Sequence, residues 1–217
     1  MTLSPHTTAL LVIDMQRDFL EPEGYAARAG LDIWLLRAAI LPLTQLVAAA
    51  RDCGMHVVHT REGHVADLSD CPPYKRQRSL HAGAEIGANG PLGRLLVRGE
   101  YGHDFIDALQ PIAGETVIDK AGYSAFHGTN LQSVLESRGI DALLITGITT
   151  EVCVSSTLRS AIDLGYVCHT VADACASAYV DLHVAALRMI EVEGGVFGTV
   201  VHSQEVLTAM AQRAYAD

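Results

Sequence analysis

Short, nearly continuous apolar runs recur along the chain and alternate with stretches in which apolar residues repeat every three or four positions. Continuous apolar runs of this length are typical of parallel strands that helices cover on both faces. The alternation of the two patterns favours an α/β fold built on an open, doubly wound sheet. The strands are predicted at 9–14, 56–60, 116–120, 142–147, 166–171 and 196–201.

Amphipathic helices are expected between these strands, because apolar residues there keep the spacing of a single helix face. The segment 61–102 is the least regular part of the chain, and we expect it to form long loops beside a binding site. The apolar stripes of the three clearest helices are Leu43, Leu46, Val47 and Ala50, then Val154, Thr157, Leu158, Ala161 and Ile162, and finally Leu182, Ala185, Ala186 and Met189.

Composition limits the class of protein and its partners. The 217 residues carry 15 Lys and Arg against 25 Asp and Glu, a formal charge of −10, and 49% of them are hydrophobic. Such a chain can bury one substantial core, so we expect one soluble domain that spans 1–217 rather than a disordered protein. An acidic chain without runs of Lys or Arg is a poor partner for nucleic acid.

The N-terminal segment and the cysteines indicate a cytoplasmic protein without a membrane anchor. The first apolar stretch stops at Asp14 and no basic region precedes it, which excludes a secretory signal or a membrane span there. An odd number of cysteines without paired spacing predicts reduced thiols rather than disulfides. The five are Cys53, Cys71, Cys153, Cys168 and Cys175.

Three chemically suggestive residues fall where ligands bind in open α/β sheets, outside the carboxyl ends of the strands. Asp14 and Lys120 each end a predicted strand, and Cys153 follows another after a short turn. A helix N-terminus and an ammonium would both favour the thiolate, and a carboxylate could carry its proton to a leaving amine. Each residue also has an ordinary structural role, as a strand-end cap, a solvated lysine or a small buried thiol, and spacing alone does not decide between these interpretations.

At these residues the chain resembles the isochorismatase-like cysteine hydrolases, which include nicotinamidases and ureide amidohydrolases. The motifs that carry the resemblance are the stretches 9–19, 117–120 and 146–157. It implies a six-stranded parallel sheet with helices on both faces, and catalysis by Asp14, Lys120 and Cys153. In such an enzyme the cysteine attacks a carboxamide, the aspartate shuttles the proton, ammonia leaves and water hydrolyses a thioester.

The same resemblance implies further features of the site. A cis peptide bond is expected between Ile148 and Thr149, and the N–H groups of Thr149 and Cys153 would form the oxyanion hole. Phe19 matches an aromatic residue that packs on the flat substrate. Nicotinamidases hold a metal through an Asp-x-His element that this chain lacks, so His59 and His64 are better explained as loop or core histidines. We therefore expect no metal and no cofactor.

The stretches 60–64, 75–76, 147–150 and 194–198 are similar to biuret hydrolases, which indicates a small linear ureide of the biuret, triuret or guanylurea type as substrate. Those enzymes have a glutamine where this chain has Glu193. The helical stripe that includes Met189 predicts that Glu193 faces inward, where an ionised carboxylate accepts hydrogen bonds from a cationic substrate end. The alternative is a salt bridge to Arg61 or Arg159, or a surface position if the helix frays.

Other functions remain open at this point. The first alternative keeps the chemistry but changes the substrate to ureidoacrylate or a carbamoyl amino acid. The second is a non-catalytic protein that binds a small amide or senses redox state through Cys153. The family resemblance also implies a homo-oligomer, either a dimer or a tetramer, with 195–198 as a contact.

Overall fold

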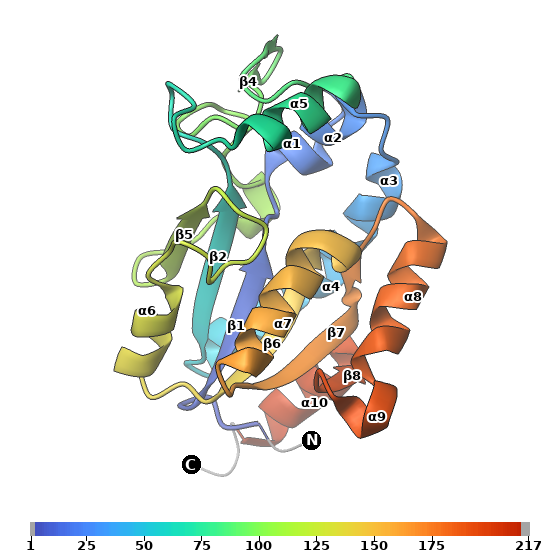
Figure 1. Cartoon of the computed structure of the whole chain (residues 1–217). Coiled ribbons are helices and arrows are strands. Elements are labelled where there is room, and N and C mark those ends of the chain that lie inside the picture. The colour runs from blue at the N-terminus through green and yellow to red at the C-terminus, as the bar shows by residue number, and fades with distance from the viewer. Residues whose placement is uncertain (1–2, 214–217) are drawn as a thin grey trace.

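The computed structural model describes residues 3–213 and is built on one six-stranded, fully parallel sheet (Figure 1). Neighbouring strands follow the order β5-β2-β1-β6-β7-β8, which confirms the doubly wound α/β architecture. All six predicted strands are present, although β7 runs longer than expected and β8 is shorter. The strands are β1 (Thr8–Ile13), β2 (His56–Glu62), β5 (Thr116–Lys120), β6 (Ala142–Ile148), β7 (Val167–Ala176) and β8 (Thr199–Val201).

The central strand β1 explains why the predicted runs are apolar throughout. Every residue of β1 is buried, because β2 and β6 flank it in the sheet and helices cover both of its faces. Successive side chains of a strand point to opposite faces. Leu10 and Val12 accordingly belong to one hydrophobic core, whereas Leu11 and Ile13 belong to the other.

Helices pack on both faces of the sheet. Helices α4 and α10 complete the core that contains Leu10, and α6, α7 and α8 complete the core that contains Leu11 (Figure 1). The helices are α1 (Arg17–Leu20), α2 (Tyr25–Arg28), α3 (Ile33–Leu36), α4 (Ile40–Asp52), α5 (Pro73–His81), α6 (Leu131–Ser137), α7 (Ser155–Asp163), α8 (Val180–Ile190), α9 (Val192–Gly195) and α10 (Ser203–Arg213).

By length and composition alone, the helical stretch Ile33–Asp52 could cross a membrane. It comprises α3, the short turn Arg37–Ala39 and α4. Its apolar side packs in the core, where Leu36, Leu43 and Leu46 are fully buried. Core packing therefore accounts for part of the apolar composition of this stretch, whereas Trp34 and Leu41 are exposed.

Two expectations about secondary structure are wrong. The segment 61–102 is not only loop, because it contains α5 and a small hairpin of β3 (Asn89–Gly90) and β4 (Gly93–Arg94). Helix α8 buries Ala186 and Ile190, whereas Leu182 and Met189 of the predicted stripe are exposed. Apolar residues occur on more than one side of α8, so periodicity alone could not identify the side that packs against the sheet.

The topology brings four strand ends together. Strands β5, β2, β1 and β6 lie side by side and parallel, so their carboxyl ends form one edge of the sheet. Ligands bind at this edge in open α/β sheets, near the point where the strand order reverses. The candidate residues of the sequence fall at the ends of these strands.

Candidate active site

Asp14 directly follows β1 and leaves the strand in an unusual backbone conformation. Its φ of 54° lies in the left-handed region, which residues other than glycine seldom adopt. Its N–H donates to the carbonyl oxygen of Thr60 at 3.1 Å, and the Thr60 hydroxyl donates to Asp14 Oδ1 at 2.6 Å. The neighbouring strand therefore holds the carboxylate in place, and the residue is only 1% exposed.

Glu62 and Lys120 are the last residues of β2 and β5 and stand opposite each other in the register of that strand pair. Both are buried. Parallel pairing thus places an acidic and a basic side chain next to each other at the sheet edge. Charged groups in such a place need partners within the protein, because water no longer solvates them.

Cys153 reaches the same edge from β6. The peptide bond between Ile148, the last residue of β6, and Thr149 is cis, as the resemblance implies. The chain then forms a single π-helical turn, Thr150–Val154, that carries the cysteine, and α7 begins only after it. Turns of this type are frequent at functional sites. The thiol therefore lies in the turn before α7 rather than in the helix itself.

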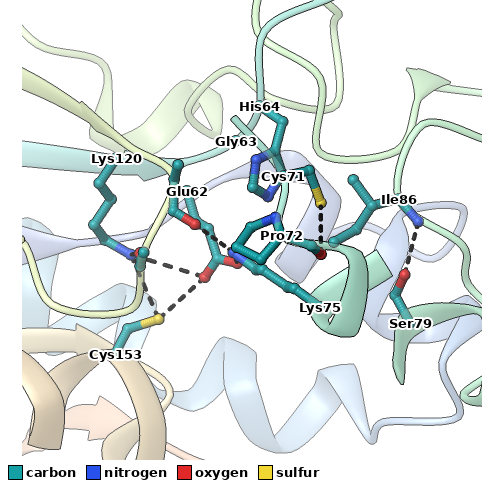
Figure 2. Close-up of polar contacts among 12 residues, drawn as sticks. Glu62, Gly63, His64, Cys71, Pro72, Lys75, Ser79, Ile86, Lys120 and Cys153 are labelled. Atoms are coloured by element: carbon teal, nitrogen blue, oxygen red, sulfur yellow. Dashed lines mark hydrogen bonds and ion pairs between the residues drawn. The ribbon is translucent and has the colours of Figure 1, made fainter. Parts of the chain in front are cut away.

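The three predicted catalytic residues meet around the ammonium of Lys120. Its Nζ lies 2.7 Å from Asp14 Oδ2 and 3.5 Å from Cys153 Sγ. Glu62 joins them, because the Cys153 thiol donates to Glu62 Oε2 at 3.3 Å (Figure 2). Nucleophile, ammonium and carboxylates therefore occupy one buried cluster.

The electrostatics of the cluster differ from the sequence-based expectation that a helix N-terminus and an ammonium favour the thiolate. Burial raises the pKa of the Cys153 thiol well above its ordinary value, and the charges of Asp14 and Glu62 raise it further. The Lys120 ammonium offsets only part of this. Burial works against the charge of Lys120 as well, but the neighbouring groups, Asp14 foremost, outweigh it and raise the pKa of Lys120. Burial and the two carboxylates therefore favour the protonated thiol, whereas the neighbouring carboxylates favour the charged form of the lysine.

A pocket of about 480 Å³ opens onto this cluster. Cys153, Asp14 and Glu62 line it, together with Thr149 of the expected oxyanion hole. Phe19 lines the pocket as well, and its packing on a substrate stays a prediction. The other residues around the pocket include Tyr25, Arg78, Tyr123, Ile148, Val152 and Tyr179.

The expectation for Glu193 is wrong. Helix α8 ends at Ile190, and Glu193 has a left-handed backbone with a φ of 53°, so the helical period does not continue to it. The side chain is exposed and does not line the pocket. Periodicity alone does not show where a helix ends before two glycines. The period of α8, extended to Glu193, therefore predicts an inward side chain.

Three residues of the cluster could by their geometry hold a metal ion. Oxygen and sulfur atoms of Asp14, Glu62 and Cys153 lie within 4.8 Å of one another, as metal ligands do. The Lys120 ammonium already contacts all three residues, however, and fills the position of a cation. The two histidines each pair with a carboxylate instead: His59 Nε2 lies 2.9 Å from Glu115, and His64 Nδ1 lies 3.1 Å from Asp70.

Sequence reasoning missed three residues of the site. Glu62 and Lys75 lie in stretches that are similar to biuret hydrolases. That similarity could have identified them as site residues, but no role was assigned to either side chain. Arg78 lies one helical turn after Lys75 on α5, in a segment that was expected to be a loop. The amphipathic spacing of a short, mostly polar helix carries little information, which is why its inner face was not recognised.

Comparisons with known proteins agree with this geometry. Residues 8–205 match the model of the isochorismatase domain. The chain is 36% identical to ureidoacrylate amidohydrolase RutB of Serratia proteamaculans over 80% of this chain and 71% of that protein. A cysteine hydrolase from Pseudomonas syringae superposes with a TM-score of 0.78 at 26% identity, over 98% of this chain and 96% of that one. N-carbamoylsarcosine amidase from Thermoplasma acidophilum gives a TM-score of 0.70 at 27% identity, over 91% and 96%.

The match to the family model covers most of the chain, and the structural neighbours share the six-stranded sheet. The chain belongs to the isochorismatase family and is a cysteine amidohydrolase that acts on non-peptide carbon–nitrogen bonds in linear amides.

Proposed function

We propose that the protein hydrolyses a small N-carbamoyl compound that carries a carboxylate, of the ureidoacrylate or carbamoyl amino acid type. The observation that carries this proposal is Arg78, a solvent-exposed residue of α5 that lines the pocket. Its polar contact there is with the Tyr25 hydroxyl, at 3.5 Å. Among residues 3–212, no carboxylate lies within 4.0 Å of this guanidinium, so its charge is available to an anionic ligand.

Arginine suits such a ligand, because its planar guanidinium can bind a carboxylate through two parallel hydrogen bonds. The pocket thus offers a reactive cluster at its floor and a cation on its wall. Ureidoacrylate and carbamoylsarcosine, the compounds in the names of two relatives, both combine a carbamoyl group with a carboxylate. A ligand of this type would place its two polar ends against the two polar regions of the pocket.

In the proposed reaction Cys153 Sγ attacks the carbamoyl carbon. The N–H groups of Thr149 and Cys153 would bind the developing oxyanion, and one such donor is typically worth roughly 3–4 kcal/mol. Lys120 adds its positive charge. A carboxylate of the cluster takes the thiol proton and returns it to the leaving nitrogen, a role that the family resemblance assigns to Asp14. Ammonia leaves, and water then hydrolyses the carbamoyl thioester.

Biuret, triuret and guanylurea form the second group of candidate substrates, supported by the motif similarity at 60–64. None of them brings a carboxylate to Arg78, and a cationic guanylurea would meet a like charge there. The argument for guanylurea rested on an inward Glu193, which the structure does not have. These compounds are therefore the comparison set for the carboxylate-bearing ureides.

A substrate panel read by ammonia release tests the proposal. It contains ureidoacrylate, N-carbamoylglycine, biuret, triuret, guanylurea and nicotinamide. We expect the highest kcat/KM for a member with both a carbamoyl group and a carboxylate. A preference of tenfold or more for biuret or guanylurea would contradict the role of Arg78. Tight binding without hydrolysis across the panel would instead favour the non-catalytic alternative.

A further inference from the structure

Glu62 lies against the sulfur of the nucleophile, although the catalytic triad of the family resemblance does not include it. It ends β2, and its side chain is almost completely buried between the lysines of two other elements (Figure 2). One is Lys120 of β5, and the other is Lys75 of α5. Burying an ionised carboxylate costs solvation free energy, so other interactions must offset this cost.

The two oxygens of Glu62 have different partners. Oε1 lies 2.6 Å from Lys75 Nζ, which holds the carboxylate on the side away from the thiol. Oε2 accepts the hydrogen bond from the Cys153 thiol at 3.3 Å and lies 3.8 Å from Lys120 Nζ. Oε2 therefore faces the one proton in the cluster that must leave for the sulfur to attack.

Asp14 is arranged differently. Its Oδ1 accepts a 2.6 Å hydrogen bond from the Thr60 hydroxyl, and its Oδ2 accepts a 2.7 Å hydrogen bond from Lys120. Both oxygens thus already make short hydrogen bonds to fixed donors. This arrangement suits a carboxylate that holds Lys120 in position. Asp14 also acts on the thiol and raises its pKa, but the acceptor that the thiol reaches at 3.3 Å is Glu62 Oε2.

Lys75 explains how Glu62 remains ionised in a buried place. Lys75 is itself buried, donates to the carbonyl oxygen of Ala121 and lies 4.9 Å from the centre of the Tyr123 ring. Burial alone would raise the pKa of Glu62, but the charges of Lys120 and Lys75 outweigh it and lower that pKa. Two ammonium groups therefore balance two carboxylates around a neutral thiol.

We propose that Glu62 is a second acid–base residue of the reaction and takes the proton of the Cys153 thiol directly. This inference rests on the proposed function, in which Cys153 is the nucleophile. As the bond between Sγ and the carbamoyl carbon forms, the thiol proton moves to Oε2, and Glu62 returns it to the leaving nitrogen as the carbon–nitrogen bond breaks. In the second half, a water proton moves to Oε2 while its oxygen attacks, and the proton returns to Sγ as the carbon–sulfur bond breaks.

These transfers keep the net charge of the cluster and the bound substrate constant, because the negative charge passes to the oxyanion as the thiol proton neutralises Glu62. The buried site as a whole therefore gains no net charge, which would be costly there. Lys75 is a positioning residue in this scheme, since it acts on the reaction only through Glu62.

The variant Glu62→Gln tests the proposal, because glutamine keeps the shape and an oxygen for Lys75 but cannot carry the proton. General acid–base catalysis typically contributes about 10²–10⁴-fold. We expect kcat on ureidoacrylate to fall at least about 100-fold with KM within about threefold. At the same time, iodoacetamide should alkylate Cys153 faster at pH 7 than in the wild type, because one negative charge beside the thiol is gone. Glu85→Gln is the matched control, since Glu85 pairs with Arg76 at the surface and should affect neither measurement.

A kcat within about threefold of the wild type in Glu62→Gln would overturn the inference. A joint loss of turnover and alkylation would also overturn it, because that result assigns Glu62 a purely structural role. If Glu62→Gln does not fold, Glu62→Asp carries the test, with an expected loss in kcat of about tenfold and an unchanged KM. Failure of the wild type to release ammonia from any ureide would refute the proposed function instead, and the alkylation comparison would still report on the contact between Glu62 and Cys153.

Discussion

The ammonium of Lys120 donates a 2.7 Å hydrogen bond to Asp14, although 106 residues separate the two in the sequence. Its distance to Cys153 Sγ is longer, at 3.5 Å. Lys120 therefore interacts more strongly with the Asp14 carboxylate than with the Cys153 thiol. Burial is the main cause that raises the pKa of the Cys153 thiol, and this sharing of Lys120 with Asp14 limits how far the ammonium can offset it. A thiol with a raised pKa needs a base to take its proton during the attack on the substrate.

The first prediction concerns the reactivity of the free enzyme. Because burial and two carboxylates raise the pKa of the Cys153 thiol, its alkylation by iodoacetamide should be slower at pH 7 than that of free cysteine. The rate should rise only in the alkaline range. Peptide mass mapping across pH separates Cys153 from the half-buried Cys71, which serves as the internal reference. Rapid alkylation of Cys153 at pH 6 would show that the thiolate is the resting form.

The second prediction concerns substrate choice. Replacing Arg78 with Gln removes a guanidinium that has no carboxylate partner among residues 3–212, and it should raise KM for ureidoacrylate roughly 10- to 100-fold, the equivalent of about 1.5–3 kcal/mol for a hydrogen bond to a charged group. The kcat/KM for biuret should change less than threefold. Arg76→Gln on the same helix is the control, because Arg76 pairs with Glu85 away from the pocket. Equal losses on ureidoacrylate and biuret would mean that Arg78 supports the pocket rather than selects the carboxylate.

The sequence predicts the scaffold well and the inner surface of the pocket less well. The strand that ends at Asp14 is identifiable because a strand buried on both faces needs apolar residues at every position. The edge strand β5 is less buried, and its end at Lys120 comes to the same side of the sheet because β2 pairs in parallel with both β1 and β5. Glu62 and Arg78 escape this reasoning, because a charged residue at a strand end or on a short polar helix looks like an ordinary surface residue until its neighbours are known. Glu193 shows the opposite error: it is predicted to be a site residue when α8 is assumed to continue to it, but its side chain is exposed.

The third prediction concerns stability against pH. Burial, together with Arg61 and Arg98, lowers the pKa of His103 to about 4. The unfolded chain takes up this proton near pH 6.5, before the folded chain does, so the free energy of unfolding should fall as the pH drops from 6.5 to 4. The contribution of His103 to this fall is about 3 kcal/mol.

Asp18 acts in the opposite direction, because burial raises its pKa to about 6 and the folded state takes up that proton first as the pH falls. A difference measurement removes this contribution. Urea unfolding at pH 7 and pH 4.5 should show a smaller loss of stability in His103→Gln than in the wild type. Equal losses in the two proteins would show that His103 is not held neutral in the folded state.

The fourth prediction concerns Gly147, two residues before Thr149 of the proposed oxyanion hole. A Cβ at this position would overlap the backbone of Ile13 in β1, and the φ of 107° disfavours any side chain. Gly147→Ala should therefore cost roughly 3 kcal/mol or more in the free energy of unfolding. Gly139→Ala shares the positive φ but meets no atom within 4 Å, so it should cost only about 1 kcal/mol. Similar unfolding midpoints for the two variants would contradict the close approach of β6 to β1.

The most direct measurement is ammonia release from ureidoacrylate by the wild type and by Cys153→Ala at equal concentrations of folded protein. The substitution removes the only atom to which the acyl group can bind in the proposed reaction. In the wild type, each substrate molecule that reacts with Cys153 should release one molecule of ammonia. Cys153→Ala should release ammonia no faster than the buffer blank, and its unfolding midpoint should be unchanged. Continued turnover by folded Cys153→Ala at a substantial fraction of the wild-type rate would contradict a covalent mechanism through this sulfur.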